Sequence, residues 1–230
     1  MLEVENLHLH AGTHPVACGY SVQFHPGEVT AIIGPNGCGK TSLMRALFGE
    51  LHPSAGHIRL NGDDQREQRL PVWRQRFGYM PQDTRLDLDL STLEVVMLGR
   101  LDRLGMRVDD DTVLAALNAL EAVGLLHIAE RPIYALSGGQ RQMALFAQVL
   151  LRSPEVMMLD EPVSALDVSI QAQIVNMLED LQDELGLTYL FIAHDLSMVK
   201  HISDRIAVMY LGNIVELAES GELYNNPQHP

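Results

Sequence analysis

The sequence has little cysteine, few basic residues and no long apolar run. Two cysteines, Cys18 and Cys38, occur among 230 residues, so a disulfide framework is excluded and we expect both thiols to be reduced. No stretch of about 18 apolar residues exists, which excludes a membrane-spanning helix. Residues 1–5 carry neither the basic nor the apolar part of a signal peptide. We therefore expect a protein of a reducing compartment that does not itself insert into a membrane.

Basic residues are outnumbered by acidic ones. Thirty Asp and Glu face sixteen Lys and Arg, a formal net charge of −14. Such a surface repels a phosphate backbone, and no basic stripe is present, so nucleic acid is disfavoured as a partner. The hydrophobic fraction of 47% is ordinary and allows residues 1–230 to form a single domain with a sizeable core.

Short apolar runs alternate with helix-compatible stretches along the chain. Fully apolar runs of four or five residues indicate parallel strands covered on both faces, and alternating runs indicate further strands. The expected strands are 2–10, 20–25, 29–33, 57–60, 77–80, 156–159 and 189–193, with a hairpin over 205–217. The expected helices are 42–48, 92–99, 110–123, one that Ser137 opens, and one from Asp167 to Gly186. This order predicts an α/β fold with a helical part inserted at roughly 84–152.

A glycine-rich segment follows the apolar run Val29–Ile33. Residues 34–41 read GPNGCGKT, which fits the phosphate-binding pattern G-x-x-x-x-G-K-[ST] between a strand and a helix. Glycines let backbone N–H groups point into one concavity, Lys40 supplies a charge for the β- and γ-phosphates, and Thr41 can bind Mg²⁺. The predicted nucleotide contacts are Gly34, Pro35, Asn36, Gly37, Cys38, Gly39, Lys40, Thr41 and Ser42.

Two carboxylates stand at the end of a predicted buried strand. Asp160 follows four apolar residues and is placed to hold the Mg²⁺ shared with Thr41. Glu161 would point the other way on an extended strand, toward an attacking water, and is predicted to act as general base. A solvated acidic turn before Pro162 is the alternative for an isolated pair, but a phosphate loop upstream favours the catalytic interpretation.

Two further polar residues also follow apolar strands. Gln82 comes after 77–80 and can contact both Mg²⁺ and the water; His194 comes after 189–193 and can contact the γ-phosphate or orient the water. Each signal is weak in isolation, because Pro-Gln loops and structural histidines are common. Their place at the carboxyl ends of strands favours a shared site with Lys40 and Glu161.

Taken together these segments resemble an ATP-binding cassette (ABC) ATPase. The matching pieces are GPNGCGKT at 34–41, Gln82, LSGGQ at 136–140, MMLDE at 157–161, SALD at 164–167 and His194. LSGGQ discriminates best, because other phosphate-loop families lack it. The resemblance implies a RecA-like core, an N-terminal antiparallel β subdomain and an inserted helical subdomain.

The same resemblance implies a partner copy. In this family LSGGQ closes over ATP bound to the other subunit, so Ser137, Gly138, Gly139 and Gln140 would complete a neighbour's site in a head-to-tail homodimer, with Asp167 near the interface. A helix start with small residues and exposed N–H donors suits a γ-phosphate. A separate integral membrane permease is the other implied partner, which would hold the chain at the cytoplasmic face of the membrane.

Two departures from the family concern the nucleotide. The family usually stacks adenine on an aromatic residue near position 11, where this chain has Ala11 with His10 beside it; Val163 replaces the usual Thr. Cys38, at a helix start beside Lys40, is expected to have a lowered thiol pKa and to react with maleimide, with ATP protecting it.

The resemblance to importer subtypes changes along the chain. Residues 1–160, with VVMLGR at 95–100, look like ATPases of iron–siderophore, haem and cobalamin importers, whereas 167–230 look like oligopeptide and dipeptide importers. The chain is either a natural intermediate or a hybrid joined near 160–167, and we lean to the hybrid. Partner choice should follow 83–135, which favours an iron-chelate or cobalamin permease; a peptide importer, a hybrid without a cognate permease, a soluble ABC ATPase of a non-membrane complex and a binding module without turnover are the alternatives.

Overall fold

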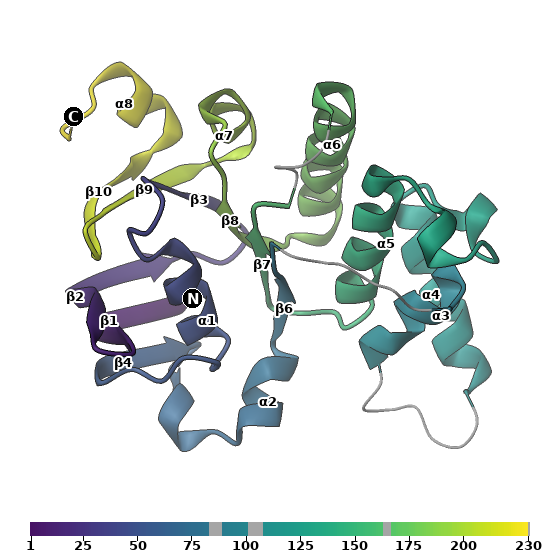
Figure 1. The fold of residues 1–230 in the computed structure, drawn as a ribbon, viewed down its shortest axis with the longest axis horizontal. Helices are drawn as coiled ribbons and strands as arrows, with labels where there is room; N and C mark the ends of the chain where they lie inside the picture. Colours follow the sequence, from purple (N-terminus) through teal and green to yellow (C-terminus); the bar gives the residue numbers. More distant parts are fainter. Residues whose placement is uncertain (83–88, 101–107, 163–166, 230) are drawn as a thin grey trace.

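Two β-sheets and a group of helices make up the chain (Figure 1). The computed structural model describes residues 1–82, 89–100, 108–162 and 167–229. The first sheet is antiparallel, with the order β2-β1-β4-β5; its strands are β1 (Leu2–Ala11), β2 (His14–Phe24), β4 (Ala55–Leu60) and β5 (Asp63–Asp64). Asn61 and Gly62, both at positive φ, form the turn between β4 and β5.

The second sheet has six strands in the order β10-β9-β3-β8-β7-β6. β9, β3, β8, β7 and β6 are parallel to their neighbours, and β10 pairs antiparallel with β9 at one edge. The strands are β3 (Val29–Ile33), β6 (Phe77–Met80), β7 (Val156–Asp160), β8 (Thr188–Ile192), β9 (Arg205–Tyr210) and β10 (Asn213–Glu219). Every residue of β7 and β8 is buried, as expected for strands covered on both faces.

Helices cover both faces of the parallel sheet. α3 (Thr92–Met97), α4 (Asp110–Ala122) and α5 (Gly138–Leu150) lie between β6 and β7 in sequence and form the part at the right of Figure 1. α1 (Lys40–Leu47) follows β3, and α6 (Val168–Leu185) follows β7. The mixed α/β architecture with an antiparallel subdomain and an inserted helical subdomain is the one that the sequence predicts.

Side chains of alternate residues on β8 enter two separate cores. Tyr189 and Phe191 pack with α4, α5 and α6, whereas Leu190 and Ile192 pack with α1 and the antiparallel sheet. Trp73 is fully buried in the second core, where its indole N–H donates to the Leu47 carbonyl over 2.8 Å. The parallel sheet is thus held from both sides, which fixes the edge where its strands end.

Three short helices escape the sequence analysis: α2 (Leu70–Gln75), α7 (Leu196–Ile202) and α8 (Ser220–Asn225). Each has six or seven residues, too few for a helical period to stand out. The capping boxes at Ser91 and Ser137 are both formed. Asp167 does precede α6 as its N-cap, but its side chain makes no cap hydrogen bond there.

Candidate functional site

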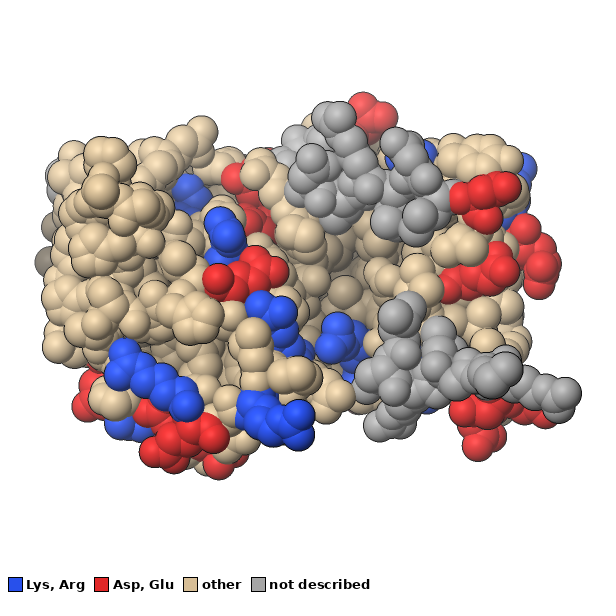
Figure 2. Space-filling model, turned by 60° about the horizontal axis from the view of Figure 1, so that its bottom comes forward, with Lys and Arg blue, Asp and Glu red and all other residues tan. Residues whose placement is uncertain are grey.

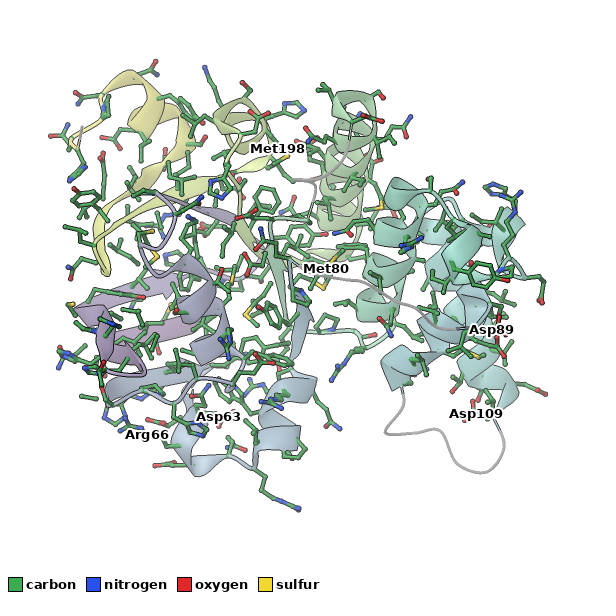
Figure 3. All side chains as sticks on the ribbon, in the orientation of Figure 1. Asp63, Arg66, Met80, Asp89, Asp109 and Met198 are labelled. Atoms are coloured by element: carbon green, nitrogen blue, oxygen red, sulfur yellow. The ribbon has the colours of Figure 1, made fainter. Side chains whose placement is uncertain are left out.

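Four strands of the parallel sheet deliver the predicted site residues to one edge. β3 leads into Gly34, β7 ends in Asp160, and β8 is followed by His194. Met80, the last residue of β6, lies between the sheets and the helical part in Figure 3, two residues before Gln82. A pocket of about 530 Å³ opens here, a volume typical of small-molecule sites. Its lining residues are Val16, Asn36, Gly37, Gly39, Lys40, Thr41, Ser42, Gln82, Glu161 and His194.

The glycine-rich loop of 34–39 is shaped by residues from elsewhere in the chain. Gly34 has φ 147°, and a Cβ there would lie 2.1 Å from the Met209 carbonyl oxygen. Gly39 has φ 110°, and a Cβ there would lie 2.5 Å from the Val16 carbonyl oxygen. Gly37 instead faces open space. Glycine is therefore needed at 34 and 39 for close packing, and the loop leaves its concave side free.

Lys40 and the start of α1 concentrate positive charge in the pocket. Lys40 is 6% exposed, and its ammonium donates to the carbonyls of Gly34 (2.8 Å) and Pro35 (3.2 Å). The N-cap of α1 is Gly39, which has no side chain to accept from the N–H groups of the first turn. Those donors and the positive end of the helix dipole favour an anion at this position.

Cys38 lies differently from the expectation. Its side chain is 4% exposed and belongs to the core beneath the loop, where Gly34 approaches its sulfur closely. Burial opposes the expected reaction with maleimide, which stays a prediction. The backbone carbonyl of Cys38 accepts from Gly212 in the β9–β10 turn over 3.1 Å, which fixes the loop from outside.

Asp160, the last residue of β7, is a buried carboxylate. It is 1% exposed, and among the described residues neither of its oxygens has a hydrogen-bond partner of good geometry. Burial raises the pKa of Asp160, while the nearby Thr41 hydroxyl and then the Lys40 ammonium act against that increase. An orphaned carboxylate next to a hydroxyl is an oxygen donor set that suits Mg²⁺.

Glu161 is held by two polar side chains from neighbouring strands. Gln82 Nε2 donates to one carboxylate oxygen over 2.8 Å, and His194 Nε2 lies 2.6 Å from the other. β7 ends at Asp160, and Glu161 adopts a left-handed φ of 51°, so it is not the extended strand residue that we expected. This turn of the backbone, with its N–H donating to Ile192, presents the carboxylate to the pocket that His194 and Gln82 also line.

The LSGGQ segment lies elsewhere. Ser137, Gly138, Gly139 and Gln140 start α5 in the helical part and do not line the pocket. Ser137 and Gln140 satisfy each other: the Ser137 hydroxyl accepts from Gln140 N–H (3.3 Å), and the Gln140 side chain accepts from Ser137 N–H (3.1 Å). The Ser137 N–H is thus not free, contrary to our expectation. Gly139 packs on α6, since a Cβ there would lie 2.5 Å from Ile170 Cγ2.

Sequence reasoning missed the supports of the phosphate loop. Val16 of β2 lines the pocket, and its carbonyl contacts Gly39 and Gly212. Gly212 also accepts from Cys18 N–H over 3.1 Å, so the β9–β10 turn joins β2 to the loop. His10 does not line the pocket; its Nδ1 lies 3.1 Å from the Ser54 hydroxyl. The remaining SALD residues, 164–166, and Val163 lie outside the described residues.

Comparison with known proteins places the site in a family. The sequence matches the family described as ABC transporter over residues 18–164. It is 39% identical over 241 residues to the oligopeptide transport ATP-binding protein OppF of Bacillus subtilis, covering 100% of this chain and 79% of that protein. The chain belongs to the ABC transporter ATP-binding family. It is also 43% identical over 213 residues to the oligopeptide transport ATP-binding protein AmiF of Streptococcus pneumoniae, covering 89% of this chain and 68% of AmiF.

Solved structures agree with this membership. The fold superimposes on cbiO1 from Clostridium perfringens, part of the ABC transporter complex cbiONQ, with a TM-score of 0.89 and 30% identity over 98% of this chain and 90% of cbiO1. A nucleotide-free ATP-binding cassette from an ABC transporter gives a TM-score of 0.90 at 25% identity, covering 100% of this chain and 96% of that cassette. As an ABC ATPase subunit of a transporter, the protein binds and hydrolyses ATP. Within the described part of the chain, no helix has the length and apolarity to cross a bilayer.

The net negative charge does not oppose an anionic substrate at this site. On the face shown in Figure 2, acidic side chains lie at the end formed by the helical part and at the lower left, and basic side chains lie across the middle and at the lower left, with acidic ones among them. The buried Lys40 and the uncapped start of α1 act at short range, where screening by solvent is weak. The local field at the pocket therefore differs from what the net charge of −14 alone implies.

Proposed function

We propose that this subunit hydrolyses Mg²⁺-ATP to drive import of peptides through a separate membrane permease. The observation that carries the catalytic part is the convergence of Lys40, Asp160, Glu161 and His194 at the carboxyl edge of one parallel sheet. The peptide transport named for the relatives at 39% and 43% identity supports the choice of cargo.

Each site residue has a role that its surroundings support. The N–H groups of the loop and Lys40 bind the β- and γ-phosphates, with Asn36 and Ser42 on the same wall. Thr41, Asp160 and Gln82 would hold Mg²⁺, which would supply positive charge to the phosphate oxygens of the bound nucleotide. The unpartnered oxygens of Asp160 support this role most directly.

Glu161 is the general base in this proposal. A proton leaves the attacking water as its oxygen bonds to the γ-phosphorus, and Glu161 accepts that proton while ADP departs. His194, 2.6 Å from one Glu161 oxygen, orients the carboxylate and contacts the γ-phosphate. Gln82 Nε2, which donates to the other Glu161 oxygen over 2.8 Å, orients the same carboxylate and contacts the water.

A second copy completes the site. Ser137, Gly138, Gly139 and Gln140 contact no phosphate loop within their own chain, and a helix start of small residues can approach a phosphate closely. We infer a head-to-tail homodimer in which each α5 start closes over the nucleotide of the other copy, with Asp167 near the interface. ATP then favours the closed pair because it contacts both copies, and loss of the γ-phosphate removes that preference.

We propose peptide import rather than import of the iron-chelate type that the segment VVMLGR at 95–100 suggested. OppF aligns with the whole chain, including the part that resembled iron–siderophore and cobalamin systems. A metal-chelate type ABC transporter of known structure is 28% identical to this chain, which keeps the iron-chelate or cobalamin type as the second candidate. The permease would hold the protein at the cytoplasmic face of the membrane.

Complementation separates these candidates. The chain is expressed in one bacterial strain that lacks its own peptide-importer ATPase and in another that lacks its cobalamin-importer ATPase. Peptide uptake should return in the first strain and cobalamin uptake should remain absent in the second, with Glu161→Gln as the inactive control. Cobalamin uptake alone would assign the second candidate. Active ATPase without uptake in either strain would favour a hybrid that lacks a cognate permease or a soluble complex.

A further inference from the structure

A second, smaller cavity adjoins the proposed hydrolytic group on the side of α6 and α7. Its volume is about 150 Å³, and its lining residues are Glu161, Gln171, Ile192, Ala193, His194, Asp195 and Met198. Glu161 and His194, whose side chains lie 2.6 Å apart, also line the larger pocket at the phosphate loop. This pair is therefore a wall that the two spaces share, and the smaller cavity gives access to it from the α6 side.

α6 directs one polar side chain toward this cavity. Gln171 precedes Ile174 and Val175, two buried residues of α6, by three and four positions, so it lies on the same side of the helix. Gln171 is half-buried, whereas Gln173, two positions later, is exposed. The helical period thus turns Gln171 inward at the edge of the sheet where β7 and β8 end.

The other end of α6 shows what a glutamine on this stripe can do. Gln182 follows the buried Leu178 by four positions, and its Nε2 donates to the Gly27 carbonyl over 2.6 Å, just before β3 begins. The stripe therefore carries an amide at each end. Gln182 fastens α6 to the edge where the strands begin, and Gln171 reaches the edge that carries the hydrolytic group.

Contacts on several sides fix the first turn of α6. The N–H groups of Ile170 and Gln171 both donate to the Asp167 carbonyl over 2.9 Å. Ile170 packs on the α5 start, where a Cβ on Gly139 would lie 2.5 Å from Ile170 Cγ2. Met198 lies on the side of α7 that faces α6 (Figure 3). A side chain that leaves such a turn is confined to few positions, as the support of a catalytic group requires.

A carboxamide suits the two groups that share the cavity with it. Its oxygen accepts and its nitrogen donates, so it can pair with a carboxylate or with either state of an imidazole. The volume also allows a water molecule to bridge them. Ile192, Ala193 and Met198 make much of the remaining wall apolar, and polar contacts in such surroundings are stronger than in water.

We propose that Gln171 is a positioning residue for ATP hydrolysis, which keeps Glu161 and His194 in their productive orientation from the α6 side. This role rests on the proposed function of Glu161 as general base. Gln171 is not among the described residues that line the nucleotide pocket. Its loss therefore slows the chemical step and leaves nucleotide binding unchanged.

The test compares Gln171→Ala with the parent and with Gln173→Ala, a matched control on the same helix. Phosphate release from the full chain gives kcat and KM, and displacement of a fluorescent ATP analogue gives Kd. In Gln171→Ala, kcat should fall by about three- to tenfold, the scale of one hydrogen bond lost in the transition state. KM and Kd should stay within about twofold of the parent, which also shows that the variant is folded. Gln173→Ala should match the parent in all three.

Gln171→Met separates the amide from the space that it fills, because methionine keeps the length of the side chain without its polar atoms. Its kcat should be as low as that of Gln171→Ala. Recovery of the parental kcat in Gln171→Met would show that the side chain only packs, and would overturn the proposal.

A double-mutant cycle with His194→Ala tests whether Gln171 acts through the pair. In the His194→Ala background, Gln171→Ala should lower kcat by less than about twofold, because the group that it orients is gone. Full additivity, a parental kcat in Gln171→Ala, or a loss confined to KM and Kd would each contradict the positioning role while hydrolysis by Glu161 stands. Parental turnover in Glu161→Gln would instead reject the proposed function, and the role of Gln171 with it.

Discussion

Two helices in this protein begin beside glycines but satisfy their first backbone N–H groups in opposite ways. α1 begins after Gly39 at φ 110°, with no side chain to cap its first N–H groups. α5 begins after Ser137, whose hydroxyl and N–H are both paired with Gln140. The first N–H groups of α1 have no side-chain cap and are suited to an anion, whereas the start of α5 is capped by side chains of its own chain.

The difference shows which half of a nucleotide site each helix can form. The α1 start shares one pocket with Lys40, Gln82 and Glu161, so one side of the proposed triphosphate site comes from a single chain. The α5 start has only the small residues Gly138 and Gly139 beside its cap; it belongs to the helical part (Figure 1) and does not line that pocket. A phosphate bound by another copy can accept from backbone N–H groups at this helix start in place of the Ser137 hydroxyl. The following changes test the difference between the α1 start and the α5 start, beginning with the largest expected effect.

Glu161→Gln removes the proposed base and keeps nearly the same side-chain size and shape in the pocket at the α1 start. Hydrolysis should fall by about 10²–10⁴-fold, the usual contribution of general base catalysis, while ATP binding persists. Phosphate release and equilibrium binding measure the two effects. Turnover at the parental rate would show that another group accepts the proton.

Lys40→Ala removes the charge that complements the α1 start. Affinity for ATP should fall by about 10- to 150-fold, because a hydrogen bond to a charged group contributes about 1.5–3 kcal/mol. Calorimetric titration measures the loss, and Lys200→Ala on α7, outside the pocket, is the control. Equal affinities in the parent and Lys40→Ala would mean that the triphosphate binds elsewhere.

Asp160→Asn tests whether the buried negative charge of Asp160 lowers the stability of the fold when no cation is bound. Burial raises the pKa of Asp160, so its ionised form disfavours folding, and the parent loses stability as pH rises through that pKa. Without nucleotide and Mg²⁺, the neutral variant should be more stable by about 1–3 kcal/mol at pH 8, with a smaller difference at pH 4. Chemical denaturation at both pH values measures this. A stability difference that does not grow from pH 4 to pH 8 would contradict the argument.

The smallest expected effect concerns the capping boxes at the starts of α3 and α5. Ser91→Ala and Ser137→Ala each remove the hydroxyl of an equivalent box, so each should cost about 1 kcal/mol of stability. Thermal unfolding should show similar losses of about 2–4 °C for both. ATP-dependent dimerisation, measured by light scattering in the Glu161→Gln background, should weaken only in Ser137→Ala. Equal dimerisation of the two variants would leave Ser137 with a structural role.

Local chemistry made much of this fold predictable from sequence. Val29–Ile33 and Phe77–Met80 have the predicted bounds, because apolar runs between turn residues suit buried parallel strands. The helices after Ser91 and Ser137 begin where the sequence analysis expects them, because a serine followed three residues later by Glu or Gln favours a helix start. The convergence of Gln82, Glu161 and His194 followed from a general property of parallel sheets.

What escaped prediction depends on contacts between distant residues. Met209 of β9 and Gly212 of the β9–β10 turn approach the phosphate loop, and no local pattern indicates that approach. The burial of Cys38 follows from the same packing. The left-handed Glu161 is a backbone conformation that a β-strand pattern does not anticipate and that tertiary contacts must maintain.

Cross-linking between copies tests the composite site most directly. Chains carrying Ser137→Cys are mixed with chains carrying Asn36→Cys, both with Cys18→Ser, Cys38→Ser and Glu161→Gln, so that a link between the two introduced positions must join two chains. With saturating ATP and Mg²⁺, a short bifunctional maleimide should give a covalent dimer that each variant alone fails to give, and ADP should abolish it. Absence of the mixed dimer under saturating ATP, with both thiols accessible to a monofunctional maleimide, would contradict the account.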